Sequence, residues 1–317
     1  MPSNFPAGFN GGLNVRRMPI LNSYPNSAIW VKSGATANGD GTFNRPYSTL
    51  QAALNAAEAS KGDIIMIKAG HAESIPDAST LILNKAGVQI IGLGVGGNRP
   101  TFTFTTANTA AINVTANSVS VQNCLFLAAF LNVATCFNIA NAQVATDFVV
   151  DGCEFRDTSV ILNFVAIVKV GTTANIADGL TLTNNRVLAA ILTTVPAGQT
   201  MLVTASAIDR MNVSYNVVIY PKTLADTACL IEAGALDLTN AEIRGNQTFR
   251  PSTSTIGHLI GSSSTACSGF VSDNYCAHLD NSAGLIIPTG TKFSFFENYS
   301  MVTGAADKSA LINPVAV

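Results

Sequence analysis

Residues 119–126 read Val-Ser-Val-Gln-Asn-Cys-Leu-Phe, an alternation of apolar and polar side chains that breaks at a turn-forming Asn. A two-residue period is typical of a half-buried strand, and the break indicates a turn into a second strand. Versions of this pattern recur at residues 148–155, 180–187, 211–218, 242–246, 270–275 and 293–298. A unit that returns at intervals of roughly 30 residues is the signature of a stacked repeat.

The turn of each unit supplies one column when the copies are aligned: Cys124, Cys153, Asn185, Asn216, Asn246, Tyr275 and Asn298. Asn tolerates the left-handed backbone conformation that a sharp turn between strands requires. We therefore predict that Asn185, Asn216 and Asn246 stack in successive coils as an amide ladder, at the strand spacing of about 4.8 Å. Cys124 and Cys153 are expected to fill the same column in the preceding coils.

A second column of short apolar strands keeps the same phase along the chain: Ile112, Ile139, Ile167, Val203, Ile231, Ile260, Ile286 and Ile312. Helical repeats would need apolar residues at i, i+3, i+4 and i+7, whereas these segments alternate. Leucine-rich repeats would show several fixed leucines in each unit, and these are absent. The pattern predicts an all-β chain folded as a single parallel β-helix, a solenoid whose coils stack on one another.

The chain divides into three segments. Residues 1–28 are rich in Pro, Gly and Asn and are expected to lack regular structure. Residues 29–62 are expected to hold one strand and a helix over residues 48–60, with a capping box of Ser48 and Gln51 and an apolar face of Leu50, Leu54 and Ala57. A solenoid must cover its open end, so this helix is predicted to cap a β-helix that spans residues 63–317.

The N-terminal segment allows two interpretations. A frayed terminus is usual for such a composition. Alternatively, the segment is an extended arm that docks on a partner, with isolated apolar side chains in partner pockets and arginines against partner carboxylates. The residues assigned to docking are Phe5, Phe9, Leu13, Arg16, Arg17, Met18 and Ile20. We favour the docking arm, because these residues have no core of their own to enter.

Composition limits the class of partner. Charged residues make up 11% of the chain and the net charge is −2, which leaves no basic footprint for nucleic acid. The longest apolar runs are strand-length and do not suggest a membrane span, and the first residues do not resemble a secretory signal. The six cysteines lack C-x-x-C spacing and are expected to be buried reduced thiols, although stacking would also permit a disulfide between Cys124 and Cys153.

Three acidic residues, Asp151, Glu154 and Asp157, form the best candidate for acid–base chemistry. Glycosidases need two carboxyl groups about 5–9.5 Å apart, and stacked coils could supply them. However, the column of Asp151 continues as Thr183 and then Ser214, so no column of carboxylates persists. We interpret the three acidic residues as solvated turn residues, and we expect no catalytic residue.

Other motifs also favour a structural role. Residues 92–97 match G-x-G-x-x-G, but a turn and a strand follow where a dinucleotide site needs a helix. His71, His258 and His278 lie far apart and lack the short spacing of a zinc site. We therefore expect neither a metal site nor a cofactor.

Short motifs near the beginning of the chain carry a family resemblance: Gly39-Asp-Gly-Thr42, Pro46-Tyr47, a Leu-Gln-Ala-Ala helix, Gly62-Asp-Ile-Ile65 and Lys68-Ala-Gly70. This succession resembles the opening of right-handed, pectate-lyase-like β-helix proteins, among them many phage tailspikes and other virion proteins. The continuation through Gly70-His-Ala-Glu-Ser-Ile75 and Asn98-Arg-Pro-Thr-Phe-Thr-Phe104 resembles uncharacterised bacteriophage structural proteins. The resemblance extends from about residue 29 to the end, and it implies a right-handed coil and a phage origin.

These observations lead to a functional hypothesis. We expect a phage capsid decoration or cement protein, made in the host cytoplasm and located on the virion surface. It would have no enzymatic activity, and its arm would bind the major capsid protein or another virion protein. A homo-oligomer such as a trimer is expected, with no nucleic acid or membrane partner. The alternative is a tailspike-like protein that binds or degrades polysaccharide through a groove of carboxylates and aromatics, and a non-viral β-helix is a third possibility.

Overall fold

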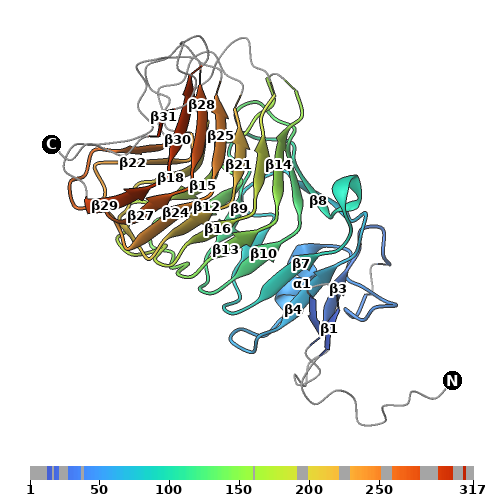
Figure 1. The fold of residues 1–317 in the computed structure, drawn as a ribbon. Helices are drawn as coiled ribbons and strands as arrows, with labels where there is room; N and C mark the ends of the chain where they lie inside the picture. The colour runs from blue at the N-terminus through green and yellow to red at the C-terminus, as the bar shows by residue number, and fades with distance from the viewer. Residues whose placement is uncertain are drawn as a thin grey trace.

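The computed structural model describes residues 13–15, 18–20, 28–36, 39–159, 161–190, 199–220, 229–250, 259–278, 292–302 and 310–311. Successive coils contribute strands to three sheets, which we call the first, second and third walls (Figure 1). Strands pair in parallel within every wall, except that β31 is antiparallel to β30. The chain is thus a right-handed parallel β-helix, and the fold class predicted from the repeat is confirmed.

The strands of each wall follow one another along the axis of the β-helix. The first wall contains β3 (Ile29–Val31), β4 (Ile64–Ile67), β7 (Gln89–Gly92), β10 (Ser120–Gln122), β13 (Val149–Asp151), β16 (Thr181–Thr183), β20 (Asn212–Ser214), β24 (Ala241–Arg244), β27 (Ser268–Ser272) and β29 (Lys292–Phe296). The second wall contains β5 (Ala72–Ile75), β8 (Thr101–Phe104), β11 (Leu125–Ala128), β14 (Glu154–Asp157), β17 (Arg186–Leu188), β21 (Val217–Ile219), β25 (Gln247–Arg250), β28 (Tyr275–His278), β30 (Tyr299–Val302) and β31 (Ala310–Leu311). The third wall contains β6 (Ile82–Leu83), β9 (Ile112–Val114), β12 (Phe137–Ile139), β15 (Ala166–Val170), β18 (Thr200–Thr204), β22 (Ile231–Gly234) and β26 (Ile260–Ser262), and a corner pair joins β19 (Ile208–Asp209) to β23 (Leu238–Thr239).

The register of the first wall matches the alignment made from the sequence. Val121 pairs with Val150, which pairs with Leu182 in the next coil. Asp151 is followed in its column by Thr183 and then Ser214, as predicted. The turn that ends each of these strands is therefore placed correctly by the apolar–polar alternation alone.

The register predicted for the third wall is wrong by one or two residues. The residues that align are Ile112, Phe137, Val168, Leu202, Ile231 and Ile260, so Ile139, Ile167 and Val203 fall beside the true column. Ile286 and Ile312 lie outside the described residues. The cause is the sequence of strands such as Ala166–Val170, which is apolar at consecutive positions and does not reveal which side chains face inward.

The interior is a continuous apolar core in which aromatic rings stack from coil to coil. Phe126 lies between Phe102 and Phe155 in the second wall, with ring centroids 5.6 and 5.1 Å away. Phe137 of the third wall packs edge-on against Phe126 at 5.2 Å. Repetition of one side chain at one inward position gives each ring a partner above and below, and each aromatic pair adds about 0.5–1.5 kcal/mol beyond area burial.

Helix α1 (Leu50–Ala56) covers the end of this core. The predicted apolar face is present, because Leu50, Leu54 and Ala57 are buried. The predicted capping box is wrong: Thr49 is the N-cap, and its side chain accepts a hydrogen bond from the backbone N–H of Ala52. The helix is also shorter than predicted, since residues 48–60 contain only seven helical residues.

The helix is tied to all three walls by side-chain hydrogen bonds. The side chain of Gln51 accepts from the backbone N–H of Ile82 (2.8 Å) at the edge of the third wall. Because Thr49 is the N-cap, Ala52 and not Gln51 occupies the position that a capping box would use. Glu73 in β5 accepts from the backbone N–H of Leu50 (2.9 Å), and Asp63 beside β4 accepts from that of Glu58 (2.8 Å). The helix and the residues that follow it thus satisfy a backbone N–H group of the first coil and have two of their own satisfied by that coil.

The N-terminal segment contains some regular structure, contrary to the prediction. Strands β1 (Leu13–Val15) and β2 (Met18–Ile20) form an antiparallel pair that stands apart as a two-stranded sheet. Pro19 is compatible with this pair because no further strand requires its backbone N–H. The docking residues Phe5, Phe9, Arg16 and Arg17 lie outside the described residues, and the docking role remains a proposal. In the described part of the chain, no helix has the length and apolar character to cross a lipid bilayer.

Candidate binding site on the second wall

An asparagine ladder at one corner places the residues of the candidate site. Asn185, Asn216 and Asn246 lie in successive coils, and the side-chain oxygen of each accepts from the backbone N–H of the preceding column residue at 3.0 Å. Side-chain amides also bond directly, from Asn216 to Asn246 at 2.9 Å. The ladder continues through Asn274 and Asn298. Tyr275, which the sequence alignment placed in this column, is the next residue along the chain, and Asn274 takes the position.

Each ladder Asn immediately precedes a strand of the second wall, so the first residue of that strand points outward. The outward column reads Arg186, Val217, Gln247, Tyr275 and Tyr299, one residue from each coil. A parallel column two residues later includes Leu188, Ile219, Phe249 and Ala277. Inward residues lie between the two columns. The outer face of the second wall is therefore aliphatic and aromatic in this region.

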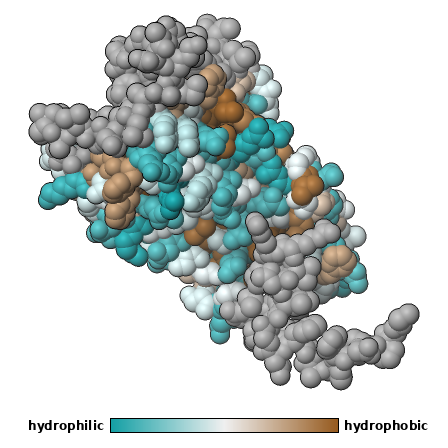
Figure 2. Space-filling model, viewed as in Figure 1, coloured by the Kyte–Doolittle hydropathy of each residue, from teal (hydrophilic) through white to brown (hydrophobic). Residues whose placement is uncertain are grey.

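A hollow of about 400 Å³ lies on this outer face. Its described lining comes from β21, β25, β28 and β30: Val217, Ile219, Gln247, Thr248, Phe249, Tyr275, Cys276, Ala277 and Tyr299. Figure 2, in the orientation of Figure 1, shows a strongly apolar patch over β21 and β25. Four adjacent strands span about 14 Å at the usual strand spacing, so the hollow is elongated along the axis of the β-helix.

Aromatic side chains form one end of the hollow. The rings of Tyr275 and Tyr299 stack at 5.0 Å between centroids and 10° between planes. Tyr275 is 52% exposed and Phe249 is 42% exposed, although both are large and largely apolar. Because stacking holds the two tyrosine rings against each other, they form a rigid ridge with hydroxyl groups available to a ligand. Exposed aromatic residues gathered at one place mark an interaction site more often than scattered ones do.

A second exposed aromatic pair lies on the first wall. Phe270 and Phe296 are 59% and 53% exposed, with ring centroids 6.3 Å apart. Figure 2 shows a paler apolar patch over β27 and β29, where these strands run. The neighbours of Phe270 in its column are Glu242 and Ser294, both polar. This pair therefore stands on a polar face, unlike the hollow.

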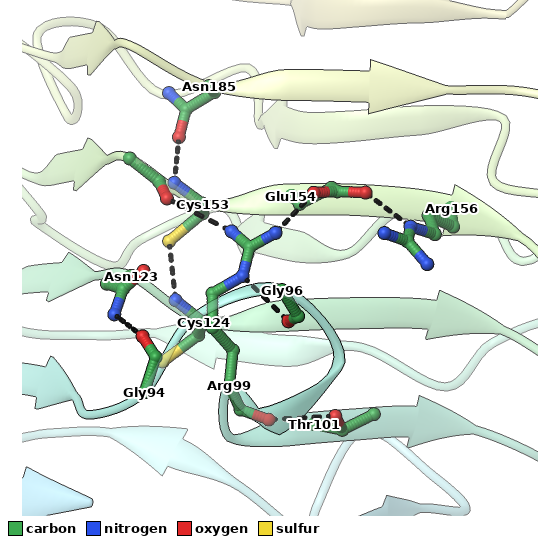
Figure 3. Close-up of polar contacts among 11 residues, drawn as sticks. Gly94, Gly96, Arg99, Thr101, Asn123, Cys124, Cys153, Glu154, Arg156 and Asn185 are labelled. Carbon is green, nitrogen blue, oxygen red and sulfur yellow. Dashed lines mark hydrogen bonds and ion pairs between the residues drawn. The ribbon is translucent and has the colours of Figure 1, made fainter. Parts of the chain in front are cut away.

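The acidic cluster considered from the sequence does not form a shared site. Glu154 is only 4% exposed and is bonded to two arginines, Arg99 and Arg156, as Figure 3 shows. Burial opposes ionisation of Glu154, but the hydrogen bonds from Arg156 and Arg99 outweigh it and lower the pKa of this carboxyl. The prediction of a solvated turn residue is thus wrong for Glu154.

The other two carboxylates serve separate turns. Asp151 accepts from the side chains of Thr183 and Asn184, both at 2.8 Å. Asp157 accepts from the backbone N–H of Phe164 (3.1 Å) and from Gln199 (3.1 Å). None of these hydrogen bonds joins one carboxylate to another. Asp151 and Asp157 thus hold coil corners together through these hydrogen bonds.

The glycine-rich corner at residues 92–97 explains how Arg99 reaches Glu154. A short 3-10 turn η1 (Gly96–Asn98) is followed by strand β8, not by an α-helix. Gly94 has a φ of +99°, and a Cβ there would lie 2.7 Å from the carbonyl oxygen of Asn98. The corner folds back so that the Nε of Arg99 donates to Gly96 (3.2 Å) while its guanidinium meets Glu154. The corner thus holds Arg99 against Glu154 of the second wall.

The histidines and cysteines are placed as follows. The Nδ1 of His71 accepts from the backbone N–H of Ser33 (2.8 Å), and its Nε2 lies 3.0 Å from Glu73. His258 lies outside the described residues, and the described residues contain no group of three or more potential metal ligands from His, Cys, Asp and Glu. All six cysteines are buried, as expected. Burial raises the pKa of the Cys153 thiol to about 12.

Comparisons with known proteins found similar solved structures but no match in sequence. No family model matches the chain, and no curated protein matches it. A rhamnogalacturonan lyase is similar in structure at 11% identity, with 85% of this chain and 87% of that chain covered and a TM-score of 0.42. The pectin methylesterase from Aspergillus niger matches at 14% identity, with 92% and 93% covered and a TM-score of 0.42. ORF18 of Geobacillus virus E2 matches at 13% identity, with 89% and 63% covered and a TM-score of 0.33. Likeness at these levels shows the parallel β-helix fold alone.

These matches correct the expectation of a protein without enzymatic activity. The lyase and the methylesterase are enzymes, so the β-helix fold is no reason to exclude catalysis. The expectation rested on the absence of a carboxylate column running from coil to coil. Carboxyl groups contributed by different turns can also face one another at glycosidase separations, and such a pair leaves no column in the sequence.

Proposed function

We propose that this chain binds a polysaccharide along the outer face of the second wall, as a tailspike-like protein would. The observation that carries the proposal is the elongated hollow with Phe249, Tyr275 and Tyr299 at one end and Gln247 within it. Ligand sites are typically concave and apolar, with a few polar groups that fix orientation. A sugar chain presents apolar C–H faces and hydroxyl groups in alternation, which suits aromatic rings beside an amide.

The dimensions of the hollow favour an oligosaccharide over a protein partner. Its volume of about 400 Å³ lies within the 300–1,000 Å³ that is typical of small-molecule sites. A stable protein interface uses roughly 20–30 residues on each side. The described lining contains nine residues in four strands, and its long direction follows the axis of the β-helix. This shape accommodates a short stretch of an extended chain.

The family resemblance supports a phage particle as the setting. The N-terminal motifs, such as Gly39-Asp-Gly-Thr42, resemble those of tailspikes and other virion proteins. A capsid decoration protein is the second candidate, and the docking arm with Phe5, Phe9 and Arg16 is the feature that favours it. In both cases the arm attaches the chain to the major capsid protein or another virion protein, and a homo-oligomer is compatible with either.

The test is a calorimetric titration of the full chain with surface polysaccharides purified from a panel of bacterial hosts. Released reducing ends and unsaturated products are measured in the same samples. We expect at least one polysaccharide to bind, and Tyr275→Ala to weaken that binding about 10- to 100-fold, since burial of an aromatic side chain contributes about 1.5–3 kcal/mol.

Phe270→Ala is the matched control, because it removes an equally exposed ring from the first wall. It should leave binding unchanged while Tyr275→Ala weakens it. The proposal fails if no polysaccharide binds, or if Tyr275→Ala binds as tightly as the unmodified protein.

A further inference from the structure

The chemistry of the hollow indicates which sugars it selects. Of the described residues that line it, none carries a charge. Its floor is aliphatic, with Val217, Ile219 and Ala277 partly exposed. The exposed hydrogen-bonding groups are the amide of Gln247 and the hydroxyls of Tyr275 and Tyr299, all of them neutral. Within its described lining, the hollow therefore offers much apolar contact, few hydrogen bonds and no counter-ion.

This lining discriminates against acidic sugars. A carboxylate that leaves water without a cationic or multiply hydrogen-bonding partner carries a large desolvation cost. A methyl group on a neutral sugar has no such cost, and it gains free energy when it displaces water from an aliphatic floor. The same floor gives less to a hydroxymethyl group, because its hydroxyl loses water without finding a partner.

The nearest described cation in the outward column lies outside the hollow. Arg186 is exposed and pairs in register with Val217, one strand before the lining begins. On its other side, its register partner is Glu154. An acidic sugar that bound through Arg186 would be centred over β17, and not over the aromatic end formed by β28 and β30. Replacement of Arg186 therefore distinguishes an acidic sugar bound over β17 from a neutral sugar bound at the aromatic end.

We infer that the hollow selects neutral sugars that bear a methyl group, such as 6-deoxyhexoses, with the methyl on the Val217–Ile219 floor and the ring against Tyr275. This inference rests on the proposed function, because it assigns a sugar class to the same site. One methyl group placed in an apolar pocket changes affinity about 10- to 200-fold. Specificity then comes from the floor, and affinity comes from the aromatic end.

The experiment titrates the full chain with three hexasaccharides of equal length. These are an L-rhamnose hexamer, a maltohexaose and a hexagalacturonate, measured with the unmodified protein and with Ile219→Ser, Tyr275→Ala and Arg186→Gln. We expect the rhamnose hexamer to bind about tenfold or more tightly than maltohexaose, and hexagalacturonate to bind weakest. Ile219→Ser should remove the preference for rhamnose, and Arg186→Gln should leave rhamnose binding unchanged.

Two outcomes overturn the inference while the proposed function stands. The first is that hexagalacturonate binds best and loses its affinity in Arg186→Gln. The second is that none of the three hexasaccharides binds, although a host polysaccharide binds and depends on Tyr275. If no host polysaccharide binds either, the proposed function falls together with the inference. A melting temperature for each variant confirms that it is folded, and Ile219→Thr, which keeps a β-branched side chain, replaces Ile219→Ser if that variant unfolds.

Discussion

Replacement of Asn216 by Leu tests the ladder that positions the outer face of the second wall. Asn216 is completely buried. Its side-chain oxygen accepts from the backbone N–H of Asn185 (3.0 Å), and its amide donates to the carbonyl of Leu182 (2.8 Å) and to the side chain of Asn246 (2.9 Å). Leu shares the branched shape of Asn but is larger, so the change removes the hydrogen bonds and opens no cavity, and any overpacking adds to the cost.

The expected loss of unfolding free energy follows from the hydrogen bonds that are removed and from the partner groups left unpaired. Three hydrogen bonds at about 0.5–1.5 kcal/mol each give a loss of about 1.5–4.5 kcal/mol, and the orphaned N–H of Asn185 places the value toward the upper end. Guanidinium denaturation followed by circular dichroism measures the loss. Hydrogen exchange adds a local reading, because the amide of Asn185 should lose protection more than amides in distant coils.

Asn117→Leu is the matched control. Asn117 is exposed and accepts one hydrogen bond, from the backbone N–H of Thr146 at 3.2 Å. Its replacement should cost less than about 1 kcal/mol, as is usual for surface changes. Equal stability of the two variants, or unchanged exchange at Asn185, would show that the ladder does not hold the corner.

Three further predictions concern the acid–base and capping groups. Glu154→Gln should cost about 1.5–3 kcal/mol, because Arg99 keeps its charge in a nearly buried position. The folded-state pKa of Glu154 lies below 4.5, so the ionised carboxyl contributes its full share of the unfolding free energy above pH 4.5. This share is lost as the pH falls through the folded-state pKa. Acid titration should show the loss in the unmodified protein and not in the variant. Cys153, with a thiol pKa of about 12, should resist a thiol reagent at pH 8 until the chain unfolds, and rapid native modification would contradict its burial. His71→Phe should lower the stability of the N-terminal capping segment by about 1–3 kcal/mol. The fluorescence of Trp30 should then change at a lower guanidinium concentration than the circular dichroism signal does. Coincident transitions would show that the capping segment does not unfold separately.

The sequence predicted the coil well where polar residues mark the turns. In the first wall, strands such as Thr181–Thr183 alternate cleanly and end at a turn residue, so both the register and the ladder residues Asn185, Asn216 and Asn246 were found. In the third wall, the strand Ala166–Val170 begins with three consecutive apolar residues, which obscured the direction that Lys169 marks. Tyr275 was misplaced because the unit containing it was aligned on the aromatic residue rather than on Asn274.

Neither the binding hollow nor the buried contact between Glu154 and Arg99 could be predicted from the sequence. Phe249 and Tyr275 look like core residues, because an alternating strand does not reveal which of its faces lies outward. A signal was nevertheless present, since one outward residue in each coil directly follows an Asn of the ladder, as Tyr275 follows Asn274, and the second outward residue lies two positions later. The burial of Glu154 depends on Arg99, which arrives from a corner 55 residues earlier in the chain. No local pattern contains a contact of that range.

Hydroxyl-radical footprinting of the unmodified chain tests the central claim most directly. Oxidation of Phe249, Tyr275 and Tyr299 is compared with that of Phe270 and Phe296, with and without a saturating host polysaccharide. Protection confined to the first three residues is the result that the second-wall site predicts. Protection of Phe270 and Phe296, with Phe249 and Tyr275 still oxidised at the original rate, would place the polysaccharide on the first wall and contradict the account.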